Sequence, residues 1–122
     1  MALILQYNLA PGKKLKLDLL CVRLGIYAHT VPPEQFSVPI KALTEPMTPV
    51  DLEPAKQPFQ EEMLVFCGFD SKLLDQFLSG MQESHIPPIY LKAVMTATNM
   101  NWSSEYLHDE LKKEHERFHR QR

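Results

Sequence analysis

The polar side chains best placed for chemistry lie between a predicted strand and the start of the last predicted helix. Thr96 and Thr98 offer hydroxyls, Asn99 offers an amide, and Lys92 places a cation two pleats earlier on the same strand face as Thr96. Ligands often bind at the carboxyl ends of strands in open sheets, and helix N–H groups attract anions. This corner therefore predicts a binding site for a small anionic or carboxylate-bearing metabolite, with binding residues Gly68, Lys92, Thr96, Thr98, Asn99 and Trp102.

The same corner could instead have a purely structural role. A Thr-x-Thr-Asn segment before a capped helix can use its side chains to satisfy its own backbone while the chain turns. Trp102 would then cover the core at the start of the helix, as a hydrophobic staple does. The sequence leaves both interpretations open.

Cys67 is the one candidate nucleophile. It lies near the end of an apolar run and just before a predicted helix start, where a thiol pKa can be lowered, and His29 or His85 would have to supply the base. Cysteine is also among the most buried residue types, so a packed thiol is the competing interpretation. Asp70, at the same helix start, would repel a phosphate, which argues against nucleotide hydrolysis.

No metal or cofactor is predicted. His108, His115 and His119 are spaced by seven and four residues and can share one helical face, but no acidic or cysteine ligand is clearly aimed at them. We expect these histidines to lie on the solvent-exposed end of the last helix instead of binding a metal. The two cysteines, Cys21 and Cys67, are far apart and without paired histidine spacing, which excludes a zinc finger or an iron–sulfur site.

Length and composition indicate a single domain covering residues 1–122. A net charge of -2 gives no electrostatic footprint for nucleic acid. No apolar run approaches the roughly 20 residues that span a bilayer, and no signal peptide is predicted. Two buried free thiols are typical of a reducing compartment, so we expect a cytoplasmic protein.

The hydrophobic pattern predicts alternating strands and helices. Residues 63–69 (MLVFCGF) suit a strand buried on both faces at the centre of a sheet, and Asp70 suits the cap of the helix that follows. The first helix is predicted to be amphipathic, with a core face formed by Leu15, Leu19, Leu20, Val22 and Leu24, and Gly25 should end it. The other predicted elements are strands 2–9, 26–31 and 89–96, helices 13–24 and 71–82, a helical turn at 38–44, and a last helix from Ser103 that frays over 113–122.

This order predicts an α+β, ferredoxin-like βαββαβ fold with an antiparallel sheet and an additional C-terminal helix. The alternative is a small three-layer α/β domain with a four-stranded parallel sheet. No internal repeat is visible. The proline-rich connection 32–60 is expected to be either a lid over a ligand or a linker, and its part 45–57 is expected to be extended and exposed.

The residues also support a resemblance. LVFCGFD, an amphipathic helix and LKAVMTATNMNWSSEYLHDEL resemble the small bacterial domain-of-unknown-function family numbered 3783, most strongly over Met63–Leu111. Its strand ending in Gly-Phe, its Lys-Ala-Val strand, its Thr-x-Thr-Asn corner and its Trp match Gly68, Phe69, Lys92, Ala93, Val94, Thr96, Thr98, Asn99 and Trp102. The resemblance implies a relationship and no reaction.

Two function classes follow. The first is a noncatalytic ligand-binding, regulatory or protein-interaction module. The second is a small enzyme that uses the Cys67 thiol or the Lys92/Thr96/Asn99 corner. A homodimer through a sheet edge or face is compatible with either class. The lack of paired carboxylates, a nucleophile elbow or a metal set favours binding.

Overall fold

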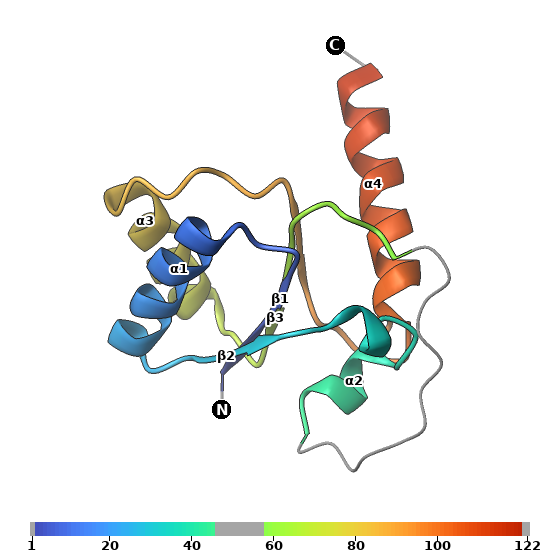
Figure 1. Ribbon diagram of the computed structural model, residues 1–122, viewed down its shortest axis with the longest axis horizontal. Coiled ribbons are helices and arrows are strands. Elements are labelled where there is room, and N and C mark those ends of the chain that lie inside the picture. Colours follow the sequence, from blue (N-terminus) through green and yellow to red (C-terminus); the bar gives the residue numbers. More distant parts are fainter. Residues whose placement is uncertain (1, 46–57, 121–122) are drawn as a thin grey trace.

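The computed structural model describes residues 2–45 and 58–120, and the side chains up to Arg117. Strands and helices alternate along the described chain (Figure 1). In order they are β1 (Leu3–Tyr7), α1 (Pro11–Leu24), β2 (Tyr27–Thr30), the 3-10 helix η1 (Pro33–Gln35), α2 (Ile40–Leu43), β3 (Met63–Cys67), α3 (Ser71–Glu83), β4 (Leu91–Val94) and α4 (Ser104–Arg120). Most of the connection's part 45–57, predicted to be extended and exposed, lies outside the described residues, so the choice between a lid and a linker stays a prediction.

The four strands form one open mixed sheet in the order β2-β1-β3-β4. β1 is parallel to β2, β3 is parallel to β4, and the central pair β1 and β3 is antiparallel. The protein is thus α+β as predicted, but the ferredoxin-like strand order is not confirmed. The reason is that each helical crossover joins two adjacent strands, whereas a ferredoxin-like sheet inserts a strand of the other half between them.

Helices cover both faces of the sheet, which makes three layers (Figure 1). α1 and α3 pack on the face that carries Ile4, Leu64 and Phe66. On the other face, Leu5 and Val65 pack with residues of α2 and α4. The layering of the alternative prediction is therefore present, while its all-parallel sheet is not.

Several local predictions are confirmed. Every residue of β3 is buried, as expected for a central strand. The Asp70 carboxylate accepts a hydrogen bond from the Leu73 N–H at 2.7 Å, which caps α3. Gly25 ends α1 with φ of 71°, a left-handed conformation that glycine adopts without strain.

The predicted core face of α1 is wrong in part. Leu15, Leu19 and Val22 are exposed, and the buried residues of α1 are Leu17, Leu20 and Cys21. Apolar residues occur on two opposite faces of this helix, so periodicity alone does not select the face that meets the sheet.

The structure contains an internal repeat that the sequence does not reveal. β1-α1-β2-α2 and β3-α3-β4-α4 have the same order, and residues 60 positions apart are equivalent up to the end of the first helix: β1 starts at Leu3 and β3 at Met63, and α1 starts at Pro11 and α3 at Ser71. Each half has a positive-φ residue directly after its first strand, Asn8 and Gly68.

The hydrogen bonds between the halves follow the same internal symmetry. The Lys41 N–H donates to the Met100 carbonyl at 2.9 Å, and the Glu105 N–H donates to the Phe36 carbonyl at 3.2 Å. Lys41 and Glu105 are 64 residues apart, as are Phe36 and Met100, so the two bonds are equivalent. The antiparallel β1–β3 pairing therefore joins two versions of one module.

Candidate functional site

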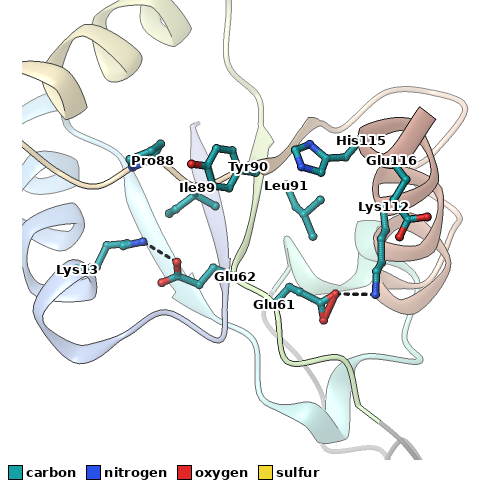
Figure 2. A pocket seen from close by; sticks show the side chains of 10 residues that line it. All are labelled: Lys13, Glu61, Glu62, Pro88, Ile89, Tyr90, Leu91, Lys112, His115 and Glu116. Atoms are coloured by element: carbon teal, nitrogen blue, oxygen red, sulfur yellow. Dashed lines mark hydrogen bonds and ion pairs between the residues drawn. The ribbon is translucent and has the colours of Figure 1, made fainter. Parts of the chain in front are cut away.

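A cavity of about 450 Å³ lies between the start of β3, the approach to β4 and helix α4, and Lys13 of α1 lines it from the first half of the chain (Figure 2). Its apolar surface comes from Pro88, Ile89 and Leu91, of which Ile89 and Leu91 are buried core residues. Tyr90 also lines the cavity and is 70% exposed, with its ring 5.7 Å from that of His115. The cavity thus combines an apolar surface with an accessible aromatic ring.

Two lysine–glutamate pairs lie on different sides of this cavity (Figure 2). Lys13 Nζ, from the first turn of α1, is 2.6 Å from Glu62 Oε1. Lys112 Nζ, from α4, is 3.3 Å from Glu61 Oε2. The cavity therefore presents positive and negative groups on both sides.

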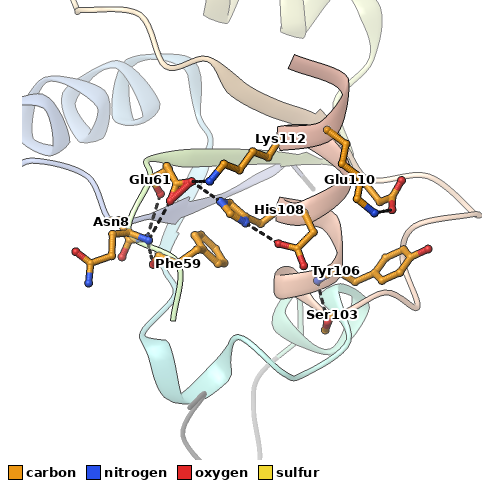
Figure 3. Close-up of polar contacts among 11 residues, drawn as sticks. Asn8, Phe59, Glu61, Ser103, Tyr106, His108, Glu110 and Lys112 are labelled. Carbon is orange, nitrogen blue, oxygen red and sulfur yellow. Dashed lines mark hydrogen bonds and ion pairs between the residues drawn. The ribbon is translucent and has the colours of Figure 1, made fainter. Parts of the chain in front are cut away.

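Glu61 also binds a buried histidine (Figure 3). His108 is 5% exposed, and its Nε2 lies 3.0 Å from Glu61 Oε2 while its Nδ1 lies 3.2 Å from Asp109 Oδ1. The ring stacks on Phe59 at a centroid distance of 4.0 Å and an interplanar angle of 8°. Both ring nitrogens of His108 are engaged, which leaves neither free to move a proton for a substrate.

These contacts hold Glu61 in its ionised form. Partial burial by itself would raise the pKa of this carboxyl, but hydrogen bonding and charge from His108, together with Lys112, outweigh it and lower the pKa to about 2. Glu61 is thus a fixed negative charge at the edge of the cavity at neutral pH.

Asn8 positions the segment that carries this carboxylate. Its side-chain amide donates to the carbonyls of Phe59 at 2.9 Å and Glu61 at 3.1 Å (Figure 3). The left-handed backbone of Asn8, with φ of 59°, directs the amide across to this segment at the end of β1. The end of the first half therefore supports the site of the second half.

The polar corner predicted from the sequence is largely occupied by its own backbone. Asn99 Oδ1 accepts from the Thr96 N–H at 2.7 Å, and Asn99 Nδ2 donates to the Val94 carbonyl at 3.0 Å. The Asn99 N–H in turn donates to the Thr96 hydroxyl at 3.2 Å. Thr98 is exposed, and Trp102 is half-buried with its ring 4.7 Å from that of Tyr106. This geometry supports the structural interpretation of the corner.

Lys92 is not brought together with the start of α4. It pairs in register with Leu64, on the sheet face that α1 and α3 cover, and α4 packs on the opposite face. Its Nζ donates to the Ile89 carbonyl, and burial lowers its pKa. Gly68, directly after β3, does lie at the same end of the sheet as Thr96, since β3 and β4 are parallel. Binding at this corner stays a prediction.

Both cysteines are free and buried, as predicted. Burial raises the pKa of the Cys67 thiol to about 11. For Cys21, burial and then the charge of Asp18 raise the pKa to about 11. Thiols of this kind are protonated at neutral pH and are poor nucleophiles.

The histidines of α4 differ from one another. The expectation of a solvent-exposed helix end is wrong for His108, which packs in the interior against Phe59. Among the described residues, no group of three or more histidine, cysteine, aspartate or glutamate side chains is arranged to hold a metal ion. The side chain of His119 lies outside the described residues.

The fold and the site together define a mixed α+β domain of two βαβ halves, with a charged cavity lined mainly by the second half. Residues 62–118 of the chain match the family model described as Domain of unknown function (DUF3783), which confirms the resemblance. The match spans β3, α3 and β4 and most of α4, so it includes Glu62, His108 and Lys112. No curated protein and no solved structure matches the chain.

Within the part of the chain that the structure describes, no helix has the length and apolar character needed to cross a membrane.

Sequence reasoning missed the charged residues of the cavity, Lys13, Glu61, Glu62 and Lys112. Their pairing joins elements far apart in the chain and leaves no local signal. The burial of His108, by contrast, does have a local sequence signal. His108 lies on the same helical stripe as Ser104, Leu107 and Leu111, which faces the core.

Proposed function

We propose that the protein is a noncatalytic binding module whose cavity takes a small zwitterion that carries a carboxylate, an ammonium group and an apolar body. Amino acids form this chemical class. The observation that supports the proposal best is the pair of lysine–glutamate ion pairs beside one apolar cavity, Lys13–Glu62 and Lys112–Glu61.

Charge favours a zwitterion over a simple anion. The cavity is lined by Lys13 and Lys112 but also by Glu61, Glu62 and Glu116. A ligand carboxylate can approach a lysine while its ammonium approaches a glutamate, so each charge of the ligand finds a partner. An anion alone would face the glutamates unpaired.

The apolar surface suits the body of the ligand. Pro88, Ile89 and Leu91 offer hydrocarbon, and the exposed ring of Tyr90 offers stacking or cation–π contact. A volume of about 450 Å³ lies in the range of pockets that bind small molecules. We expect amino acids with large apolar side chains to bind more tightly than small polar ones.

The enzyme alternative has less support. The thiol of Cys67 is protonated at neutral pH and buried, and the amide of Asn99 is used by its own turn. A bacterial origin, a cytoplasmic location and a homodimer through a sheet edge or face remain predictions; the two buried free thiols support the reducing compartment.

The test is a thermal-shift screen against the amino acids, with acetate and phosphate as simple anions and alkylamines as simple cations. A ligand at 100 times its Kd stabilises the folded state by about 2.7 kcal/mol, a shift of several degrees in Tm. We expect apolar amino acids to raise Tm, and Lys112→Met and Glu62→Gln each to remove the effect.

Lys72→Met is the matched control, because Lys72 is an exposed lysine of α3 outside this cavity. It should leave the shift unchanged. If acetate or alkylamines stabilise the protein as much as any amino acid, or if Lys112→Met keeps the full shift, the zwitterion site is wrong.

A further inference from the structure

Helix α1 carries an apolar stripe that faces away from the protein. Leu15, Leu19 and Val22 are 63%, 63% and 79% exposed, and their spacing of four and three residues places them on one side of the helix. The opposite side buries Leu17 and Leu20 against the sheet. A helix that is apolar on two opposite faces is typical of one that lies between two layers of protein.

The internal repeat provides a comparison for this stripe. α3 packs beside α1 on the same face of the sheet and has the same pattern of buried and exposed positions. Its residues equivalent to Leu15, Leu19 and Val22 are Asp75, Ser79 and Gln82. The fold therefore accepts polar side chains at these positions, and the stripe on α1 serves something other than folding.

We propose that the outer face of α1 docks an amphipathic helix of a partner protein, with acidic residues along the flanks of the partner's apolar face. α1 has four basic residues and one acidic residue in a chain whose net charge is -2. Lys13 and Lys14 are paired with Glu62 and Asp18. An acidic helix complements this locally basic surface.

The remaining two basic residues border the stripe. Lys16 directly follows Leu15, and Arg23 directly follows Val22; because they are seven residues apart, they lie along one flank. Neither is in an ion pair with another described residue. The groove between α1 and α3 beside Arg23 is lined by Lys72 but also by Asp75 and Glu83, so the basic character belongs to the flank of α1 and not to the α3 side.

A second copy of the chain is a poorer occupant. Two α1 faces would bring like-charged helices together, which opposes association. Three aliphatic side chains also offer much less than the roughly 800 Å² per partner that a standard protein interface buries. A single helix laid along α1 matches the length and width of the stripe.

The experiment uses the full chain and two fluorescein-labelled helical peptides with leucines at positions i, i+3, i+4 and i+7. One peptide has glutamates beside the leucines and the other has lysines. We expect the glutamate peptide to bind about tenfold more tightly by fluorescence anisotropy, and its affinity to fall as salt is raised.

The matched variant replaces the stripe with its α3 counterparts, L15D/L19S/V22Q. It should unfold at the temperature of the parent chain and lose peptide binding, while Glu105→Gln on α4, which packs on the other face of the sheet, should keep it. The proposal is overturned if the two peptides bind equally, if neither binds, or if the triple variant still binds. It is also overturned if the triple variant is several degrees less stable, or if the parent is a dimer that the triple variant dissociates.

Discussion

Tyr7 and Ser104 form a buried hydrogen bond that links the two halves of the chain. Both side chains are fully buried, and their oxygens are 2.6 Å apart although 97 residues separate them. Tyr7 ends β1 and Ser104 begins α4. In the described residues no buried side-chain polar atom lacks a partner, so removal of either hydroxyl creates the first such defect.

The expected cost follows from that defect. Tyr7→Phe leaves the Ser104 hydroxyl buried without a partner, and Ser104→Ala leaves the Tyr7 hydroxyl in the same state; each should cost about 1–3 kcal/mol. The double variant Y7F/S104A removes both hydroxyls together and leaves none unpaired. It should cost less than the sum of the single variants, with a coupling energy of about 1–2 kcal/mol.

Urea denaturation at neutral pH measures these free energies of unfolding. Burial raises the pKa of Tyr7, and the hydrogen bond from Ser104 offsets only part of that rise, so the phenol stays neutral throughout the assay. A change in midpoint at constant slope would report stability alone. Additive costs in the double variant, or a loss below about 0.3 kcal/mol for Tyr7→Phe, would refute the buried hydrogen bond.

Three other predictions concern residues outside this pair. Cys21 and Cys67 should react with a thiol reagent only on unfolding, because burial raises the pKa of each to about 11; rapid labelling of the native protein would contradict this. The low pKa of Glu61, about 2 against an ordinary 4.5, stabilises the fold above the ordinary value, and this contribution is lost as pH falls toward 2. In Glu61→Gln, the free energy of unfolding measured in urea should therefore fall less steeply as pH is lowered. The same pH dependence in the variant and the parent would argue against the His108 contact. Asn99→Ala should cost about 1–3 kcal/mol in urea denaturation, because it removes two side-chain hydrogen bonds to backbone, and ligand shifts at the cavity should persist; loss of those shifts would instead place the ligand at the corner.

The elements were predictable where the signal is local. The apolar run of β3, the Asp70 cap and the Gly25 terminator each act within a few residues, and all three are confirmed. Strand pairing depends instead on which segments meet after long connections. A helical crossover can join two neighbouring strands or two strands with a third between them, and the order of elements along the chain is the same in both cases. The sequence therefore does not distinguish the observed mixed sheet from a ferredoxin-like one.

Neither the internal repeat nor the cavity site leaves a local signal in the sequence. Across residues 3–26 and 63–86, Ile26 and Ile86 are the single identical pair at equivalent positions, so the repeat survives in backbone and burial and not in residue identity. The Glu61–His108 contact joins residues 47 positions apart. The corner at Thr96 and Asn99 is predicted as a site because its polar residues are close in sequence, and the structure uses that closeness for a turn.

The internal repeat also has a consequence for assembly. The backbone hydrogen bonds between β1 and β3, and those that tie residues 36–41 to 100–105, all connect one half of the chain to the other. A single stretch, residues 44–62, joins the two halves covalently. Two chains can therefore exchange halves and rebuild every one of these contacts in trans, which makes the protein a candidate for domain swapping at high concentration.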